Sequence, residues 1–76
     1  MKIKPTHYQI QARIFEKAGC IYVRKKGDHL IYHYPGAIRP VVIPKYKEVP
    51  TFVIRNNMRI IGMSREKYFE LLDAVE

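Results

Sequence analysis

The chain has 76 residues, of which 47% are hydrophobic, and it carries a formal net charge of +7 at pH 7. This length predicts a single domain over residues 1–76 with a thin core, because a chain of this size buries only about 60% of the surface that its unfolded form exposes. The hydrophobic content argues against a disordered tail. The single cysteine, Cys20, excludes an intrachain disulfide and is typical of a reducing compartment.

No stretch of the sequence has the composition of a targeting or membrane segment. The N-terminus, residues 1–5, lacks the apolar core of a secretory signal peptide. The longest apolar runs, such as 41–43, are far shorter than the roughly 20 residues that cross a bilayer. We therefore expect a cytoplasmic location and no membrane partner.

Basic residues are concentrated in the first part of the chain. Residues 1–47 contain ten basic and two acidic side chains, whereas residues 48–76 contain four and five. An uneven positive charge predicts a polyanionic partner, either a nucleic acid or an acidic protein. Solubility alone is the other explanation, but it requires no such asymmetry.

The first predicted element is a helix over residues 6–18. Thr6 is a candidate N-cap, and Gln9 completes a capping box three residues later. Gly19 supplies the stop signal. The apolar stripe of this helix has helical spacing and consists of Ile10, Ile14, Ala18 and the neighbouring Phe15.

Three short strands follow, because the next runs are rich in β-branched and aromatic residues. The predicted strands are 20–25, 29–34 and 39–43, and the turns between them are 26–28 and 35–37. Such tight connections predict an antiparallel meander, since parallel neighbours need a long crossover.

Two helices complete the chain. The first, 51–61, has an apolar stripe of Ile54, Met58 and Ile61 and stops at Gly62. Ser64 opens the second, 65–75, a short helix with Phe69, Leu72 and Val75 on one face. The order is an α+β fold of α-β-β-β-α type with a short C-terminal helix, in which the helices cover one face of a three-stranded sheet. Double-stranded-RNA-binding domains have this layout.

The leading catalytic candidate is His29, at the start of the second predicted strand beside a tight turn. RNA can be cleaved by its own 2′-hydroxyl, and the enzyme must then move protons at the reacting oxygens. Histidine suits this task, because an unperturbed imidazole has a pKa of about 6.5. The alternative is an ordinary strand histidine. His33 shares its face by alternation, but a second histidine is more often only an exposed polar residue.

Two basic clusters are expected to flank His29, because the first turn and the loop after the third strand lie at the same end of a meander. These candidate RNA-binding cations are Arg24, Lys25, Lys26, Lys45 and Lys47. Alternation prevents Arg24 and Lys25 from facing the same side. The alternative is a solvated charge run. Tyr46 is a candidate base-stacking residue, whereas Tyr32 is better explained as core.

Metal and cofactor sites are not expected. The three histidines and Cys20 lack paired ligand spacing, and the acidic residues are scattered. The sequence also has no glycine-rich phosphate loop and no nucleophile elbow.

Three segments together resemble a known family. Residues 19–32, GCIYVRKKGDHLIY, resemble the HicA toxin signature of glycine, strand, arginine, Gly-Ser-His and an Ile-Tyr pair. Residues 42–49, VIPKYKEV, look like the strand-proline-basic segment of HicA toxins, and residues 54–69 are similar to their closing helix, glycine and serine. The resemblance covers about residues 9–72.

The resemblance implies a double-stranded-RNA-binding fold and a ribonuclease that cleaves mRNA without a metal or another cofactor. It implies that the histidine of the Gly-Ser-His turn, here His29 after Gly27, is catalytic, and that a HicB-like antitoxin silences the toxin. Two positions depart from the family pattern: Asp28 replaces the serine, and Tyr46 replaces a second histidine that many members carry.

The leading functional hypothesis is therefore a metal-independent, histidine-dependent endoribonuclease toxin with mRNA and a HicB-like antitoxin as partners. The first alternative is a non-catalytic RNA-binding module, either a degenerate toxin or a regulator, which needs the basic face but no histidine. The second is a protein-interaction domain whose positive face binds only an acidic protein.

Overall fold

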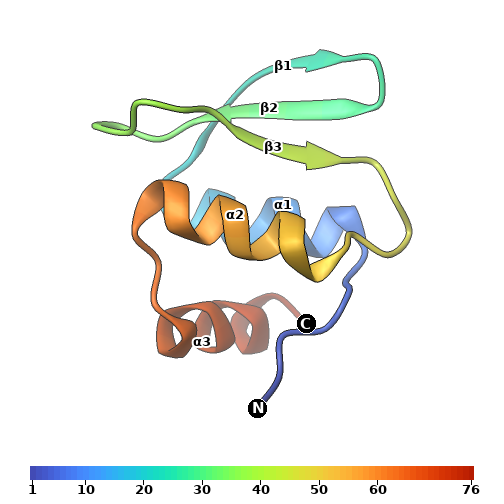
Figure 1. The fold of residues 1–76 in the computed structure, drawn as a ribbon, viewed down its shortest axis with the longest axis vertical. Helices are drawn as coiled ribbons and strands as arrows, with labels where there is room; N and C mark the ends of the chain where they lie inside the picture. The colour runs from blue at the N-terminus through green and yellow to red at the C-terminus, as the bar shows by residue number, and fades with distance from the viewer.

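The computed structural model describes residues 1–76 as a three-stranded sheet and three helices (Figure 1). The elements in chain order are α1 (Tyr8–Lys17), β1 (Ile21–Lys26), β2 (His29–His33), β3 (Val41–Pro44), α2 (Thr51–Ile61) and α3 (Arg65–Val75). This order confirms the predicted α+β fold of α-β-β-β-α type with a C-terminal helix. None of the helices combines the length and apolar character needed to span a bilayer.

The sheet is the predicted antiparallel meander, with strand order β1-β2-β3. Its register places Lys26 opposite His29 across β1 and β2, and His29 opposite Pro44 across β2 and β3. The pairing of β1 shifts between Tyr22 and Arg24, where a β-bulge interrupts the ladder. The start of β2 thus lies between the end of β1 and the end of β3.

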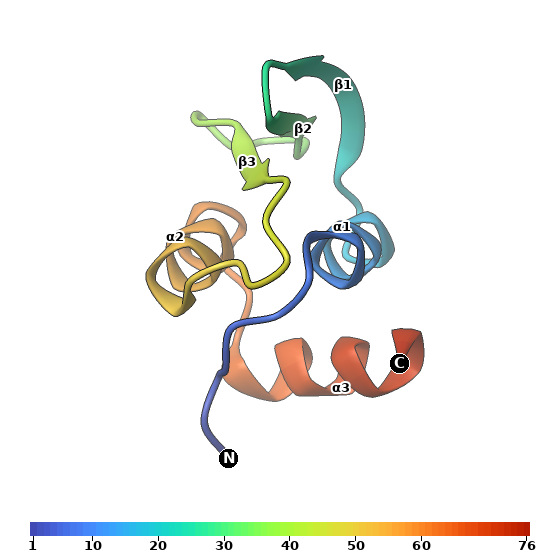
Figure 2. The same ribbon diagram turned by 90° about the vertical axis from the view of Figure 1, so that its right-hand side faces the viewer.

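The molecule has three layers. Figure 2 shows α1 and α2 beneath the sheet and α3 beneath those two helices, away from the strands. Both helices of the middle layer pack on the sheet and leave its other face uncovered, as the sequence predicted. The buried apolar side chains form one core: Ile3, Ile14, Phe15, Cys20, Tyr32, Val41, Ile43, Val49, Ile54, Met58, Tyr68 and Leu71.

The predicted N-cap of α1 is wrong by one residue. His7 caps the helix, because its Nδ1 accepts a hydrogen bond from the Gln9 N–H at 3.1 Å. Thr6 instead pairs with Val49 in an isolated antiparallel bridge, and its hydroxyl donates to the Lys4 carbonyl at 2.8 Å. The bridge holds Thr6 in an extended conformation outside the helix.

The buried faces of α1 and α3 also differ from the predicted stripes. In α1, Ile14 is fully buried, but Ile10 and Ala18 are only half-buried, and the polar Gln11 is buried beside them. The buried positions of α3 are Tyr68 and Leu71, whereas the predicted stripe of Phe69, Leu72 and Val75 is only partly covered. Both differences arise because α1 packs between the sheet and α3 rather than against the sheet alone.

The two edges of the sheet have different surroundings. On the β3 side, the Asn57 side chain of α2 hydrogen-bonds the backbone of Val42. On the β1 side no element covers the strand, and every residue of β1 is exposed. Ile21, Tyr22 and Val23 each expose about half of their surface there, at 57%, 50% and 54%.

Candidate functional site

His29 is the first residue of β2 and its side chain is exposed. The preceding turn is tight because Gly27 adopts a left-handed conformation, with φ of 59°, which glycine reaches at little cost. The imidazole takes part in no hydrogen bond within the chain, so both ring nitrogens are available to a ligand. The local sequence therefore holds this histidine rigidly at the end of the sheet while leaving it accessible.

The structure brings the two predicted basic segments to the same end of the sheet. The Lys45 N–H donates a hydrogen bond to the Asp28 carbonyl at 2.7 Å, which ties the loop after β3 to the turn after β1. His29 lies between these segments, opposite Lys26 on one side and Pro44 on the other. The expected proximity of the two segments is confirmed.

The cations of β1 divide between the two faces of the sheet. Lys26 lies opposite His29 and Arg24 opposite Ile31, so both share the uncovered face with His29 and His33. Lys25 lies opposite Leu30 and therefore faces the other side. The expectation that Arg24 and Lys25 cannot face the same way is confirmed.

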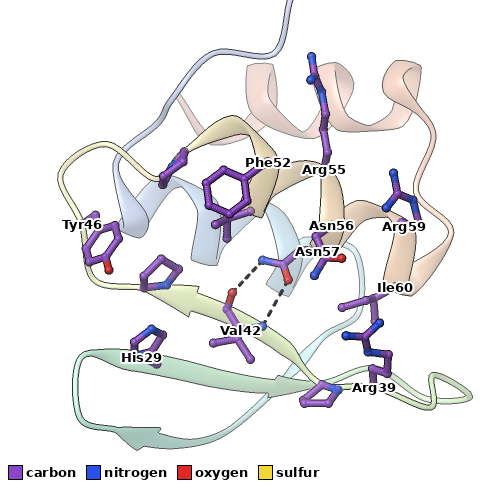
Figure 3. A pocket seen from close by; sticks show the side chains of 14 residues that line it. His29, Arg39, Val42, Tyr46, Phe52, Arg55, Asn56, Asn57, Arg59 and Ile60 are labelled. Atoms are coloured by element: carbon purple, nitrogen blue, oxygen red, sulfur yellow. Dashed lines mark hydrogen bonds between the residues drawn. The ribbon is translucent and has the colours of Figure 1, made fainter.

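A groove of about 740 Å³ runs between β3 and α2, with His29 and Tyr46 at one end (Figure 3). Prolines and aliphatic side chains supply its apolar lining, namely Pro40, Val42, Pro44, Pro50, Val53 and Ile60. The aromatic rings of Tyr46 and Phe52 also line it and are exposed to 48% and 73%.

Three arginines that the sequence reasoning missed also line this groove. Arg55 and Arg59 come from α2, one helical turn apart, and Arg39 precedes β3. In Figure 3, Arg39 and Arg59 lie at the end opposite His29. No carboxylate lines the groove. The i, i+4 spacing of Arg55 and Arg59 in the sequence could have identified these two residues as a pair on one helix. The prediction rested instead on the adjacent basic residues of β1.

Of the predicted site residues, only His29 and Tyr46 line the groove. Lys45 and Lys47 are exposed beside it. The Lys45 ammonium lies 5.7 Å from the centre of the Tyr8 ring, a cation–π contact with α1. Arg24 and Lys26 remain on the uncovered face, so the sheet supplies positive charge beside His29, whereas Arg39 and Arg59 lie at the far end of the groove (Figure 3).

Asn57 fixes the wall of the groove. Its Nδ2 donates to the Val42 carbonyl at 2.9 Å, and the Val42 N–H donates to its Oδ1 at 3.4 Å. The side-chain amide thus takes the place of a neighbouring strand at the outer edge of β3. Asn57 is only 3% exposed, so these bonds are largely shielded from water and hold α2 at a fixed position.

Two titratable groups near the sheet belong to the core. Burial and a hydrogen bond to Glu16 raise the pKa of Tyr32 well above its ordinary value, and the Tyr32 hydroxyl donates to Glu16 Oε2 at 2.7 Å. This confirms Tyr32 as a core residue rather than a hydroxyl donor to a ligand. Burial also raises the pKa of the Cys20 thiol to about 11, which keeps this thiol protonated near neutral pH.

The fold and the site define a small basic α+β domain with the layout of double-stranded-RNA-binding domains. The chain belongs to the HicA toxin family, because residues 11–63 match the family model described as HicA toxin of bacterial toxin-antitoxin. Comparison with curated proteins gives no match. The chain is thus a toxin of a toxin–antitoxin system, whose family members are generally mRNA-cleaving ribonucleases, and this membership implies a cognate antitoxin and an RNA substrate.

Proposed function

We propose that this toxin is a metal-independent endoribonuclease that cleaves mRNA with His29 as its catalytic residue. The observation that carries the proposal is the position of His29. Its exposed imidazole stands at the end of a groove lined by three arginines and shares the uncovered face with Arg24 and Lys26. A proton-transfer group and cations for phosphate thus occur together.

The proposed reaction uses the 2′-hydroxyl of the substrate as nucleophile. The 2′-oxygen forms a bond to the adjacent phosphorus and loses its proton, while the bond from phosphorus to the 5′-oxygen breaks and that oxygen gains a proton. The products are a 2′,3′-cyclic phosphate and a 5′-hydroxyl. His29 can accept the first proton or donate the second, because either ring nitrogen is free for the transfer.

The cations around His29 would stabilise the negative charge that develops on the phosphoryl oxygens. Lys26 is the nearest in register, directly opposite His29 on the same face of the sheet. A lysine at this position supplies charge without needing a fixed geometry, since its ammonium group is a point charge on a flexible stem.

The decisive test compares His29→Ala with His33→Ala. His33 lies on the same strand and face and is also exposed, so the two variants remove the same group four residues apart. In excess chelator, we expect the parent and His33→Ala to cut RNA into 2′,3′-cyclic and 5′-hydroxyl ends. His29→Ala should be slower by about 100-fold or more, and DNA of the same sequence should stay intact because it lacks the 2′-hydroxyl. Cleavage by His29→Ala at the parent rate would contradict the proposal.

One observation favours a second candidate, a non-catalytic RNA-binding module. Asp28 places an exposed carboxylate next to His29, where the family has serine, and an anion there opposes the approach of phosphate. This candidate predicts salt-sensitive RNA binding with no cleavage between about pH 5 and 9, a range around the ordinary imidazole pKa. Cleavage by the parent chain would exclude it.

We also propose that a HicB-like antitoxin neutralises the toxin by covering His29. Expression of the parent chain alone should arrest growth and deplete mRNA, and co-expression with a small acidic HicB-like protein encoded beside it should restore growth. Growth arrest that this neighbour does not relieve would contradict the antitoxin assignment.

A further inference from the structure

We propose that the groove between β3 and α2 binds single-stranded RNA and leads it to His29. In this arrangement the groove arginines bind phosphates, and the exposed aromatic rings stack on bases. The inference rests on the proposed ribonuclease function and adds to it the conformation of the substrate and the path that it follows.

The first argument is the unpaired charge of the groove. Arg39, Arg55 and Arg59 line it without a carboxylate among the lining residues. The single salt bridge of the chain joins Lys67 and Glu70 on α3, so none of the three guanidinium groups is neutralised within the protein. Guanidinium groups bind phosphate through paired hydrogen bonds. Arg39 and Arg59 lie together at one end of the groove and match a phosphate backbone there, whereas the Arg55 side chain extends away from His29 (Figure 3).

The second argument is the exposure of aromatic surface in the same groove. Phe52 is 73% exposed and Tyr46 is 48% exposed, and an apolar lining lies beside them. Bases stack on such rings only when they are unpaired and accessible. A double helix keeps its base faces inside and presents sugars and phosphates, so it cannot use Phe52 in this way. The lining therefore favours a single strand over the duplex that the fold alone would suggest.

The third argument is the position of the catalytic candidate. In Figure 3, His29 and Tyr46 lie at one end of the groove, Phe52 lies above its middle, and Arg39 and Arg59 lie at the other end. A strand anchored by the arginines and stacked on Phe52 therefore continues toward the imidazole. The hydrogen bonds between Asn57 and Val42 hold the two walls together, so the path exists before RNA binds.

The charge argument is tested with a double substitution, Arg39→Gln and Arg59→Gln, in the His29→Ala background, which leaves the RNA uncut. The control is Arg13→Gln with Lys17→Gln, which removes two exposed charges from α1 in a hollow shared with α3, away from the groove. The probe is a labelled, unstructured RNA oligonucleotide of mixed sequence. We expect the groove variant to bind at least about tenfold more weakly than the control. We also expect the slope of log K against log salt concentration to be shallower by about 1.4, because each of the two lost phosphate contacts contributes roughly 0.7.

The stacking argument is tested with Phe52→Ala and Phe52→Tyr in the same background. Loss of the ring should weaken binding of the single-stranded probe about tenfold, and the tyrosine should restore it, because both rings offer a face to a base. The large exposure of Phe52 means that neither change removes a core contact.

Equal binding by the groove and control variants would overturn the inference, and so would tighter binding of a duplex of the same sequence. If the groove variants lose only the antitoxin and keep RNA, the surface serves a protein and the inference also fails. In each of these cases the parent would still cut RNA through His29. A parent chain that neither binds nor cuts RNA would instead overturn the proposed function, and the groove assignment with it.

Discussion

Asp28 is the one carboxylate beside the candidate catalytic histidine. Its side chain is exposed and takes part in no hydrogen bond or ion pair, whereas its backbone carbonyl accepts from Lys45. An unpaired anion at this place contributes little to stability and would repel a phosphate bound at the proposed site. If RNA binds at His29 as proposed, Asp28 should lower its affinity.

Replacing Asp28 with asparagine should tighten RNA binding about two- to fivefold at low salt, because the amide keeps the shape of the side chain and removes the repulsion. The gain should shrink above about 0.5 M salt as the charges are screened. The control is Asp73→Asn on the exposed surface of α3, and the measurement is the dissociation constant in a salt series. Slower cleavage by Asp28→Asn would instead show that the carboxylate orients the imidazole.

The Cys20 thiol predicts a change of stability at high pH. Burial raises its pKa in the folded chain from the ordinary 9.0 to about 11, so the unfolded chain loses this proton first. The contribution of the thiol is therefore fully present below about pH 9 and is lost as the pH rises toward 11.

The measurement is the free energy of unfolding in urea at several pH values, for the parent and for Cys20→Ala. The difference between the two isolates the thiol from other groups that titrate in this range. We expect the stability advantage of the parent to fall between pH 9 and pH 11. A constant difference over this range would show that the thiol is not buried in solution.

At the scale of elements, the attachment of α2 to β3 decides the shape of the site. Asn57→Ala removes both hydrogen bonds to Val42 and should lower the free energy of unfolding by about 2 kcal/mol. The side chain of its neighbour Asn56 is exposed and makes no hydrogen bond, so Asn56→Ala should change stability by less than about 0.5 kcal/mol.

Urea unfolding of the two asparagine variants measures the difference between their free energies of unfolding. Amide hydrogen exchange at Val42 shows whether the loss of stability arises at the contact between α2 and β3. We expect faster exchange at Val42 in Asn57→Ala alone. Equal midpoints for both variants would show that α2 is held by apolar packing rather than by the amide.

The elements themselves were largely predictable from the sequence. Glycines and short β-branched runs located the strands within a few residues, and Ser64 caps α3 as predicted, with its hydroxyl accepting from the Lys67 N–H. The cap of α1 was not predictable, because the choice between Thr6 and His7 depends on the bridge to Val49, a contact distant in the sequence. Local patterns do not contain such contacts.

The candidate site was predictable only in part. The antiparallel meander implied that His29, the first turn and the loop after β3 meet at one end, and they do. The groove was not predictable, because it depends on how α2 lies against the edge of β3. That placement follows from the buried Asn57, which reads in the sequence as an ordinary polar helix residue.

At the scale of the whole molecule, the third layer depends on a polar contact within the core. The Gln11 side chain donates from Nε2 to the Tyr68 hydroxyl at 2.8 Å and links α1 to α3, while its Oε1 has no partner. Tyr68 is 1% exposed and Gln11 is equally buried, so the bond is fully shielded. Removing only one partner of a buried hydrogen bond is costly, because the other polar group is left buried without a partner.

Tyr68→Phe should therefore lower the free energy of unfolding by about 1–3 kcal/mol, because it leaves the whole Gln11 amide buried without a partner. Adding Gln11→Met should recover most of that loss, since the methionine fills a similar volume without polar atoms. A double-mutant cycle in thermal or urea unfolding measures this coupling. Additive losses would show that the two side chains do not interact.

The unequal edges of the sheet limit how chains of this toxin can associate. A further strand can be added only beside β1, because the outer side of β3 meets Asn57 and the flanking Pro40 and Pro44 have no N–H to offer. Two copies joined through β1 would form one continuous six-stranded sheet. Each of its two outer edges would be a β3 strand, which cannot pair with a further strand. Such self-association stops at a dimer and cannot propagate into fibres.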